Sequence, residues 1–205
     1  MKKKISIVAI IFIALLSSCN KSDSDNTTAT AEGIFSKQLN LSITAALTSP
    51  NYYRVMYGFS LLDDSIVALT DNMYLSIYYN PNGNSFNLAG TFNQEIGYEE
   101  GAYTNFIIKT YAVNETINAT SSSYDDGNSG KNIDGYENNI ASGYTDGNIL
   151  PGGDDKYIGV RLKLSDNKVH YGWMLLNFSA NGKTVTVIEY AYNKVANASI
   201  KAGQK

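Results

Sequence analysis

Cysteine, histidine and proline are scarce in this chain of 205 residues, which has one, one and three of them. Because Cys19 is the only cysteine, no disulfide can form within the chain, and stability must come from packing and backbone pairing. Because His170 is the only histidine and no Gly-x-Ser-x-Gly segment occurs, the sequence argues against two-histidine zinc sites and a serine triad. Cysteine catalysis and thiolate metal sites are excluded too, since no thiol occurs after residue 19.

Basic residues are also few in the part of the chain that is expected to fold. Lysines 2–4 are three of the sixteen basic residues, and without residues 1–18 the chain has 13 basic and 19 acidic residues, a net charge of −6. An acidic surface without a Lys/Arg cluster repels phosphate backbones, so we expect no nucleic-acid partner. Glycine loops that bind phosphates or dinucleotides are absent as well.

Helical patterns are nearly absent, and strand-forming residues take their place. After Cys19 no apolar stripe of helical spacing runs longer than two turns. The sixteen tyrosines suit a half-buried pleated surface, and the seventeen glycines, with many Asn and Ser residues, suit turns. The composition predicts a β-rich extracellular domain.

The N-terminus has the order of a secretory signal that ends in a lipid attachment site. Three lysines precede an uncharged run over residues 5–16, and Leu16-Ser17-Ser18-Cys19, which resembles the lipobox of bacterial lipoproteins, follows. The run is too short to cross roughly 30 Å of hydrocarbon, which needs about 20 residues. We expect residues 1–18 to be removed and Cys19 to carry diacylglycerol and palmitate. A plain cleaved signal with an incidental Cys19 is the alternative.

A polar tether follows the lipid attachment site over residues 19–32. It has no large apolar side chain, so burial cannot offset the entropy of ordering it. Its start, Ser22-Asp23-Ser24-Asp25, resembles the acidic export tags of surface lipoproteins in some Gram-negative bacteria, and a plain solvated linker is the alternative. We predict a lipid-anchored protein of the outer membrane, at the cell surface or on the periplasmic face.

Residues 33–205 are long enough for one domain and read as a series of short strands. The clearest pattern is a meander of three strands at the C-terminal end, expected over residues 158–164, 169–178 and 184–193, with alternating apolar residues and an Asn181-Gly182 turn. Six further strands are expected upstream, over residues 39–46, 52–60, 66–70, 73–79, 85–93 and 105–113. We therefore predict an all-β fold, a jelly-roll-like antiparallel β-sandwich with a C-terminal three-stranded meander.

Residues 118–156 are dense in Gly, Asn, Asp and Ser and are expected to form long loops, which in compact domains are uncommon unless they bind something. Calcium is one candidate ligand, because such loops can supply hard oxygen ligands. The expected ligands are Asp125, Asp126, Asn128 and Asp134. The spacing departs from the EF-hand template, so a solvated loop without metal, and hence no cofactor, is the alternative.

A sugar is the other candidate ligand of these loops. Aromatic rings can stack against sugar rings, and three loop tyrosines are not needed to explain folding: Tyr124, Tyr136 and Tyr144. A hydrolase with two carboxylates is a further alternative. Adjacent acidic pairs such as Asp63-Asp64 are poor candidates for it, since neighbours on a strand point to opposite faces.

Three short motifs stand in the C-terminal quarter of the chain: His170-Tyr171-Gly172-Trp173, Glu189-Tyr190-Ala191-Tyr192 and the closing segment Ile200-Lys201-Ala202-Gly203-Gln204. With these motifs, this quarter resembles a module of exported bacterial β-rich proteins of unknown function. It departs from that pattern at Ala198 and Ser199, where the module often has Pro. The resemblance implies an extracellular β-sandwich and brings no known catalytic residue.

The module's aromatic residues also predict a core. Strand alternation puts Tyr171 and Trp173 on one face and His170 and Gly172 on the other, so that Gly172 allows a bulky neighbour to cross closely. We expect Trp173 to anchor the core, with Tyr190 and Tyr192 beside it.

The sequence thus favours a non-enzymatic lipoprotein with a binding or structural module. Its expected partners are the membrane, through the lipid, and a glycan or a surface protein. A carbohydrate-binding lipoprotein of a glycan-uptake system is the first alternative, and the carboxylate hydrolase is the second.

Overall fold

The computed structural model describes residues 33–44, 57–68, 75–80, 85–89, 94–100, 106–125, 133–139, 144–146, 149–181 and 184–205. Within these ranges every regular element is a strand, which confirms the predicted all-β class. No helix in the described ranges is long and apolar enough to cross a membrane. The predicted signal, Cys19 and most of the tether lie outside the described residues.

The strands of the first half are short, apart from the first. In chain order they are β1 (Ile34–Thr44), β2 (Tyr57–Ser60), β3 (Ser65–Ala68), β4 (Leu75–Asn80), β5 (Ser85–Ala89), β6 (Gln94–Glu100), β7 (Phe106–Ile108) and β8 (Thr110–Tyr111). The second half adds β9 (Thr116–Ile117), β10 (Ser123–Asp125), β11 (Ile133–Asn139), β12 (Tyr144–Asp146), β13 (Lys156–Lys163), β14 (Val169–Phe178), β15 (Thr184–Asn193) and β16 (Ile200–Lys201).

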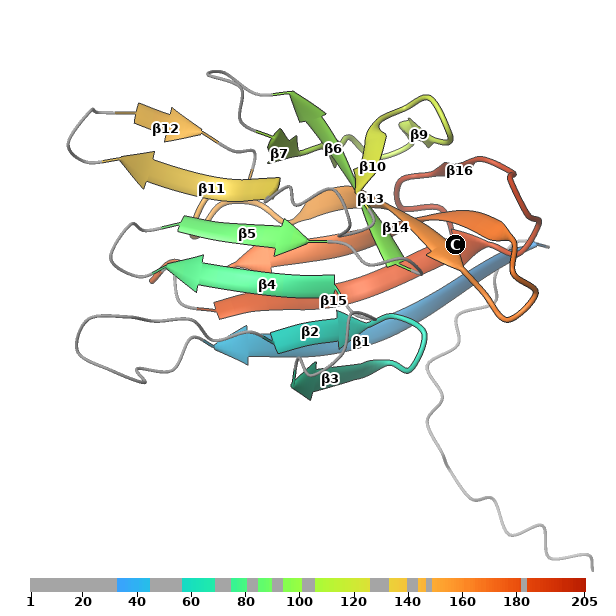
Figure 1. The fold of residues 1–205 in the computed structure, drawn as a ribbon, viewed down its shortest axis with the longest axis horizontal. Helices are drawn as coiled ribbons and strands as arrows, with labels where there is room; N and C mark the ends of the chain where they lie inside the picture. The colour runs from blue at the N-terminus through green and yellow to red at the C-terminus, as the bar shows by residue number, and fades with distance from the viewer. Residues whose placement is uncertain are drawn as a thin grey trace, which may run out of the picture.

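Fourteen of these strands form one continuous sheet, and β9 pairs with β16 in a second, small one. The main path of the large sheet runs β1-β15-β14-β13-β6-β7-β11-β5-β4-β2-β3, and the pairings are antiparallel except between β7 and β11. In Figure 1 the strands β2 to β5 lie in front of β1, β14 and β15, so the sheet folds over into two layers. The predicted antiparallel sandwich is present, and strands distant in sequence pair within it, such as β1 with β15.

The predicted C-terminal meander is confirmed. β14 and β15 begin and end at the residues that alternation predicts, and β13 pairs with β14 without interruption from Lys156 to Lys163. The turn between β13 and β14 is closed by Asn167, whose N–H donates to the Leu164 carbonyl at 2.9 Å. The backbone of Asn167 is left-handed, with a φ of 59°. Asn tolerates this region better than most residues, which explains the turn at this point.

The meander separates two hydrophobic cores, one on each face. The larger core packs Ile158, Met174 and Val187 against Phe59 of the other layer. The smaller core, on the opposite face, holds Trp173 with residues of β8, β9 and β16. Trp173 is fully buried, and its Nε1–H donates to the Gln204 carbonyl at 3.1 Å. The expectation that Trp173 anchors a core is therefore correct.

The expectation that Tyr190 and Tyr192 pack beside Trp173 is wrong. Trp173 lies opposite Ala191 on the neighbouring strand, so the two flanking tyrosines point to the other face and belong to the larger core. The register shifts at Ile188, an extra residue in β15, and a β-bulge of this kind reverses which residues face which side. The close crossing expected at Gly172 is present: Tyr192 lies opposite it, and a Cβ there would stand 2.5 Å from the Ala191 carbonyl oxygen.

The expectation of long loops over residues 118–156 is also wrong for much of that stretch. It contains β10, β11 and β12, which pair with β6, β5, β7 and one another. Polar residues dominate the sequence of these strands, which therefore has the composition of turns, and β10 and β11 become strands by pairing with β5, β6 and β7 from earlier in the chain. Strand β6 is not among the strands predicted from the sequence either.

Candidate functional site

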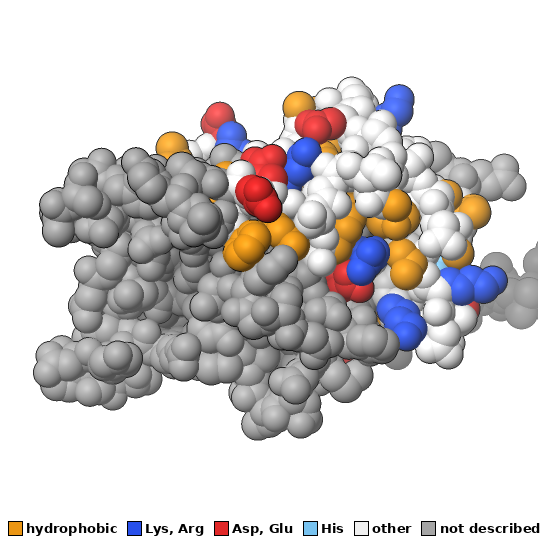
Figure 2. Space-filling model, turned by 45° about the horizontal axis from the view of Figure 1, so that its top comes forward, with side chains coloured by type: hydrophobic (Ala, Val, Ile, Leu, Met, Phe, Trp, Pro, Cys, Tyr) orange, Lys and Arg blue, Asp and Glu red, His pale blue; other side chains and the backbone are white. Residues whose placement is uncertain are grey.

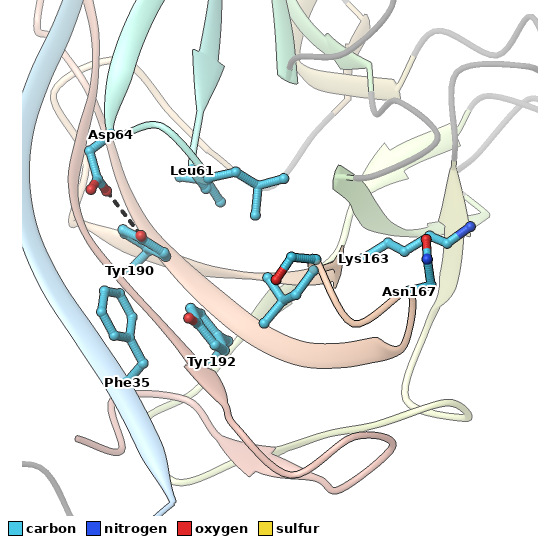
Figure 3. Close-up of a pocket in the computed structure, with 10 residues that line it drawn as sticks. Phe35, Leu61, Asp64, Lys163, Asn167, Tyr190 and Tyr192 are labelled. Carbon is cyan, nitrogen blue, oxygen red and sulfur yellow. Dashed lines mark hydrogen bonds between the residues drawn. The ribbon is translucent and has the colours of Figure 1, made fainter.

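A pocket of about 610 Å³ opens at one end of the larger core, between β1, the β2–β3 turn, the β13–β14 turn and β15. Its volume lies within the range of roughly 300 to 1,000 Å³ that small-molecule sites occupy. Figure 3 shows the aromatic rings of Phe35, Tyr190 and Tyr192 on one side and Lys163 and Asn167 on the other. The residues that line it include Phe35, Leu61, Asp64, Lys163, Asn167, Tyr190 and Tyr192.

The aromatic wall is built by the pairing of β1 with β15. The antiparallel register sets Phe35 directly opposite Tyr192, and their rings stack with centroids 4.8 Å apart and planes 26° apart. Tyr190, two residues earlier on the same face of β15, lies nearly parallel to Tyr192 at 6.4 Å and 27°. Tyr190 is buried, whereas Phe35 and Tyr192 are only partly buried and keep some ring surface open to the pocket.

Asp64 brings a carboxylate to this wall from the β2–β3 turn. The hydroxyl of Tyr190 donates to its Oδ1 at 2.9 Å, and Nζ of Lys37 donates to its Oδ2 at 2.8 Å. The backbone of Asp64 is left-handed, with φ of 52°, a region that Asp tolerates better than most residues. Asp64 is 28% exposed, so its carboxylate is fixed in position and remains accessible from the pocket.

Burial has a clear electrostatic effect on the two tyrosines. Loss of solvent raises the pKa of Tyr190 far above its ordinary value, and the negative charge of Asp64 and the hydrogen bond to it raise it further. Burial and Asp64 also raise the pKa of Tyr192. Both phenols are therefore neutral hydrogen-bonding groups at physiological pH rather than acids or nucleophiles.

The sole histidine holds the opposite side of the pocket in place. Nδ1 of His170 lies 2.8 Å from the Asn193 carbonyl, to which it must donate, and Nε2 lies 3.3 Å from Oδ2 of Asp166 in the β13–β14 turn. The ring also meets Tyr192 edge to face. The N–H of Lys168 lowers the pKa of Asp166, and His170 contributes. Because both ring nitrogens have partners, His170 serves here to position a turn and a tyrosine.

None of the site residues predicted from the sequence is among the described residues that line this pocket. Tyr124, in β10, is partly buried; its hydroxyl donates to the Asn118 carbonyl at 3.1 Å, and its ring meets Tyr171 and the guanidinium of Arg161. Burial raises the pKa of Tyr124 to about 12. Tyr136 and Tyr144 lie in β11 and β12, but their side chains are outside the described part, so the role of the three tyrosines stays a prediction.

The calcium and lipid predictions rest mainly on residues that the structure does not describe. Asp125 ends β10 and Asp134 lies in β11, whereas Asp126 and Asn128 fall outside the described ranges, as does Cys19. Within those ranges, no three His, Cys, Asp or Glu residues come together as a metal-binding group. Calcium binding and acylation both stay predictions.

The acidic pair next to the pocket does not converge as a dyad. Asp63 accepts from the hydroxyl of Ser60 at 2.7 Å, while Asp64 holds Tyr190 and Lys37. Each carboxylate thus binds its own local partners. The hydrolase alternative stays a prediction that this pair does not favour.

Sequence reasoning missed the pocket but held part of the signal for it. Tyr190 and Tyr192 stand two apart on a predicted strand, which sets them on one face. What the sequence does not give is that Phe35 and Asp64 join them from segments more than 120 residues away, as the 126-residue separation of Tyr190 and Asp64 illustrates.

No protein-family model matches the chain, and neither a curated protein nor a solved structure is significantly similar to it.

Proposed function

We propose that this chain is an exported lipoprotein, anchored at the outer membrane through Cys19, whose β-sandwich is a non-catalytic binding module. The observation that carries the proposal is the pocket between Phe35, Asp64 and Tyr192, an aromatic wall with a fixed carboxylate beside it. Binding sites are typically concave and combine apolar walls with well-placed polar groups, and this pocket sets aromatic rings beside polar side chains.

The groups around the pocket are held as in a preformed site. Phe35, Tyr190 and Tyr192 stand on paired strands, and Asp64 is fixed by two hydrogen bonds. Sites built on regular elements lose less entropy when a ligand binds, because their side chains are already ordered.

Binding without covalent chemistry fits the state of the reactive groups. Asp64 is engaged by Tyr190 and Lys37, His170 by Asn193 and Asp166, and the raised pKa of Tyr190 disfavours the phenolate. Each of these groups acts as a hydrogen-bonding or positioning group.

The anchoring half of the proposal rests on Leu16-Ser17-Ser18-Cys19 after an apolar run. It is tested by fractionating cells that express the full chain, the Cys19→Ala variant or the matched Ser18→Ala variant, which keeps a small residue before the cysteine. We expect the wild type and Ser18→Ala to need detergent for release and Cys19→Ala to leave the membrane fraction. Membrane retention of Cys19→Ala would contradict acylation.

The proposed binding function is tested by an NMR screen of small molecules from several chemical classes against the exported chain. At least one class of compound should bind saturably and lose affinity in Tyr192→Leu. A screen in which no compound class binds at this pocket would contradict the binding module.

A further inference from the structure

The three rings of the pocket form a stack rather than a cage. Phe35 and Tyr192 stack with centroids 4.8 Å apart, Tyr190 and Tyr192 are 27° from parallel at 6.4 Å, and Phe35 and Tyr190 are tilted by 51°. A cage for a quaternary ammonium needs ring faces that surround the cation from several sides. The stacked rings instead keep their apolar surface on one side of the pocket, where C–H groups of a ligand can pack against the part of Tyr192 that Phe35 leaves uncovered.

Hydrogen-bonding groups lie beside these aromatic rings on two sides. Asp64 accepts one hydrogen bond on each carboxylate oxygen, and an ionised carboxylate has about four acceptor positions, so further positions remain for a ligand hydroxyl. The β13–β14 turn adds the exposed Ser165 and Asn167 to the lining of the pocket, and their hydroxyl and amide groups both donate and accept.

The charges at the pocket oppose each other. Asp64 is paired with Lys37, and Lys163 lines the pocket on the side of the β13–β14 turn. An anionic ligand would meet the Asp64 carboxylate, and a cationic ligand would compete with Lys37. A wholly apolar ligand would cover polar groups at a cost in free energy. A neutral ligand with one apolar face and many hydroxyls meets none of these costs.

We propose that this pocket binds a neutral sugar ring of a carbohydrate, with C–H groups of the ring packed on the uncovered ring surface of Tyr192 and its hydroxyls on Asp64 and Asn167. The inference rests on the proposed function, because it names the ligand class of the same pocket. This site differs from the sugar site expected at the loop tyrosines, because its aromatic and polar groups come from both layers of the folded sheet.

On the face seen in Figure 2, hydrophobic side chains of the described part lie among charged ones, and no single broad apolar patch dominates.

The test uses the exported chain with Cys19→Ala on an array of neutral and acidic glycans, with choline and inorganic phosphate titrated separately. The first variant is Asn167→Gly. It removes the amide but keeps the left-handed backbone, since glycine adopts a φ of 59° without strain. Asn114→Gly is its matched control, because Asn114 has a φ of 69° and does not line the pocket. The second variant is Tyr192→Leu, with Tyr157→Leu as the matched loss of a partly buried tyrosine elsewhere.

We expect the chain to bind neutral glycans and Asn167→Gly to weaken that binding about tenfold, the effect of one good hydrogen bond. Tyr192→Leu should weaken it more, and both controls should bind like the wild type. Each variant is first checked for a cooperative melting transition, and Asn167→Gly keeps the test valid if Tyr192→Leu does not fold.

Binding only to acidic glycans, to choline or to phosphate would overturn the sugar assignment and leave a binding module in place. Equal weakening by the controls would also overturn it. If no glycan binds, the assignment fails, and the mixed-compound screen then decides separately whether the pocket binds anything.

Discussion

The hydroxyl of Tyr190 donates a 2.9 Å hydrogen bond to Asp64, a residue 126 positions earlier in the chain. The bond joins the two layers of the folded sheet, because Tyr190 lies in β15 and Asp64 in the turn between β2 and β3. Lys37 of β1 binds the other oxygen of the same carboxylate. One acidic side chain therefore ties three segments together beside the pocket.

Removal of that hydroxyl should destabilise the fold without disturbing the ring. In Tyr190→Phe we expect the free energy of unfolding to fall by about 1 to 2 kcal/mol, the usual contribution of a hydrogen bond to a charged group that water reaches in part. Urea unfolding measures it, and the midpoint should fall with an unchanged m-value.

Tyr157→Phe is the matched control, since its hydroxyl has no hydrogen-bond partner within the described part of the chain and its ring packs edge to face on Trp173. Its midpoint should stay within error of the wild type. A loss in Tyr190→Phe no larger than in this control would contradict the role given to the Tyr190–Asp64 bond.

Glycine at position 172 should be required by backbone sterics. In Gly172→Ala the new Cβ would stand 2.5 Å from the Ala191 carbonyl oxygen, which belongs to a paired strand and cannot move aside cheaply. We expect the free energy of unfolding to fall by about 3 kcal/mol, at the upper end of the effects of overpacking. In Gly159→Ala the atom nearest to the new Cβ is a ring carbon of Tyr111 at 3.1 Å. Its melting temperature should therefore fall clearly less than that of Gly172→Ala. Equal losses would argue against this crossing geometry.

The C-terminal segment should shield the only tryptophan. Ile200 is buried against the smaller core, and Trp173 donates to Gln204 a few residues later. Ile200→Ala should lower the free energy of unfolding by about 2 to 4 kcal/mol and should increase acrylamide quenching of Trp173 fluorescence. Val195→Ala, at a position 60% exposed, should change neither. Unchanged quenching in Ile200→Ala would contradict the contact between this segment and the tryptophan core.

Alkaline pH should weaken the fold through Tyr124. Burial raises the pKa of Tyr124 to about 12, whereas an unfolded tyrosine ionises near 10. The unfolded state therefore releases this proton first, and the stability of the folded state falls as pH rises from about 10 to about 12. In Tyr124→Phe the fall over this window should be smaller. The comparison uses urea unfolding at several pH values, and identical slopes for the two proteins would refute the assignment.

The meander could be predicted from sequence because its signals are local. Alternation from Val169 to Phe178 and an Asn-Gly turn fix strands and connection without knowledge of the rest of the chain. Trp173 as a core residue follows from the same alternation.

The rest depends on pairings between distant segments. The extra residue Ile188 sets which face Tyr190 occupies, and nothing in the local pattern of β15 marks it as a bulge. Phe35 meets Tyr192 only because β1 pairs with β15. For the same reason the local sequence of the polar strands β10 to β12 predicts loops, and the tyrosines expected to bind a ligand were assigned to these loops.

The most direct test of the account is a map of amide chemical-shift changes when a neutral glycan from the array is titrated into the exported chain with Cys19→Ala. The account predicts saturable changes around Phe35, Asp64, Asn167 and Tyr192, four positions distant in sequence that meet at one pocket. Changes confined to residues 118–156, or none near these four positions, would contradict it.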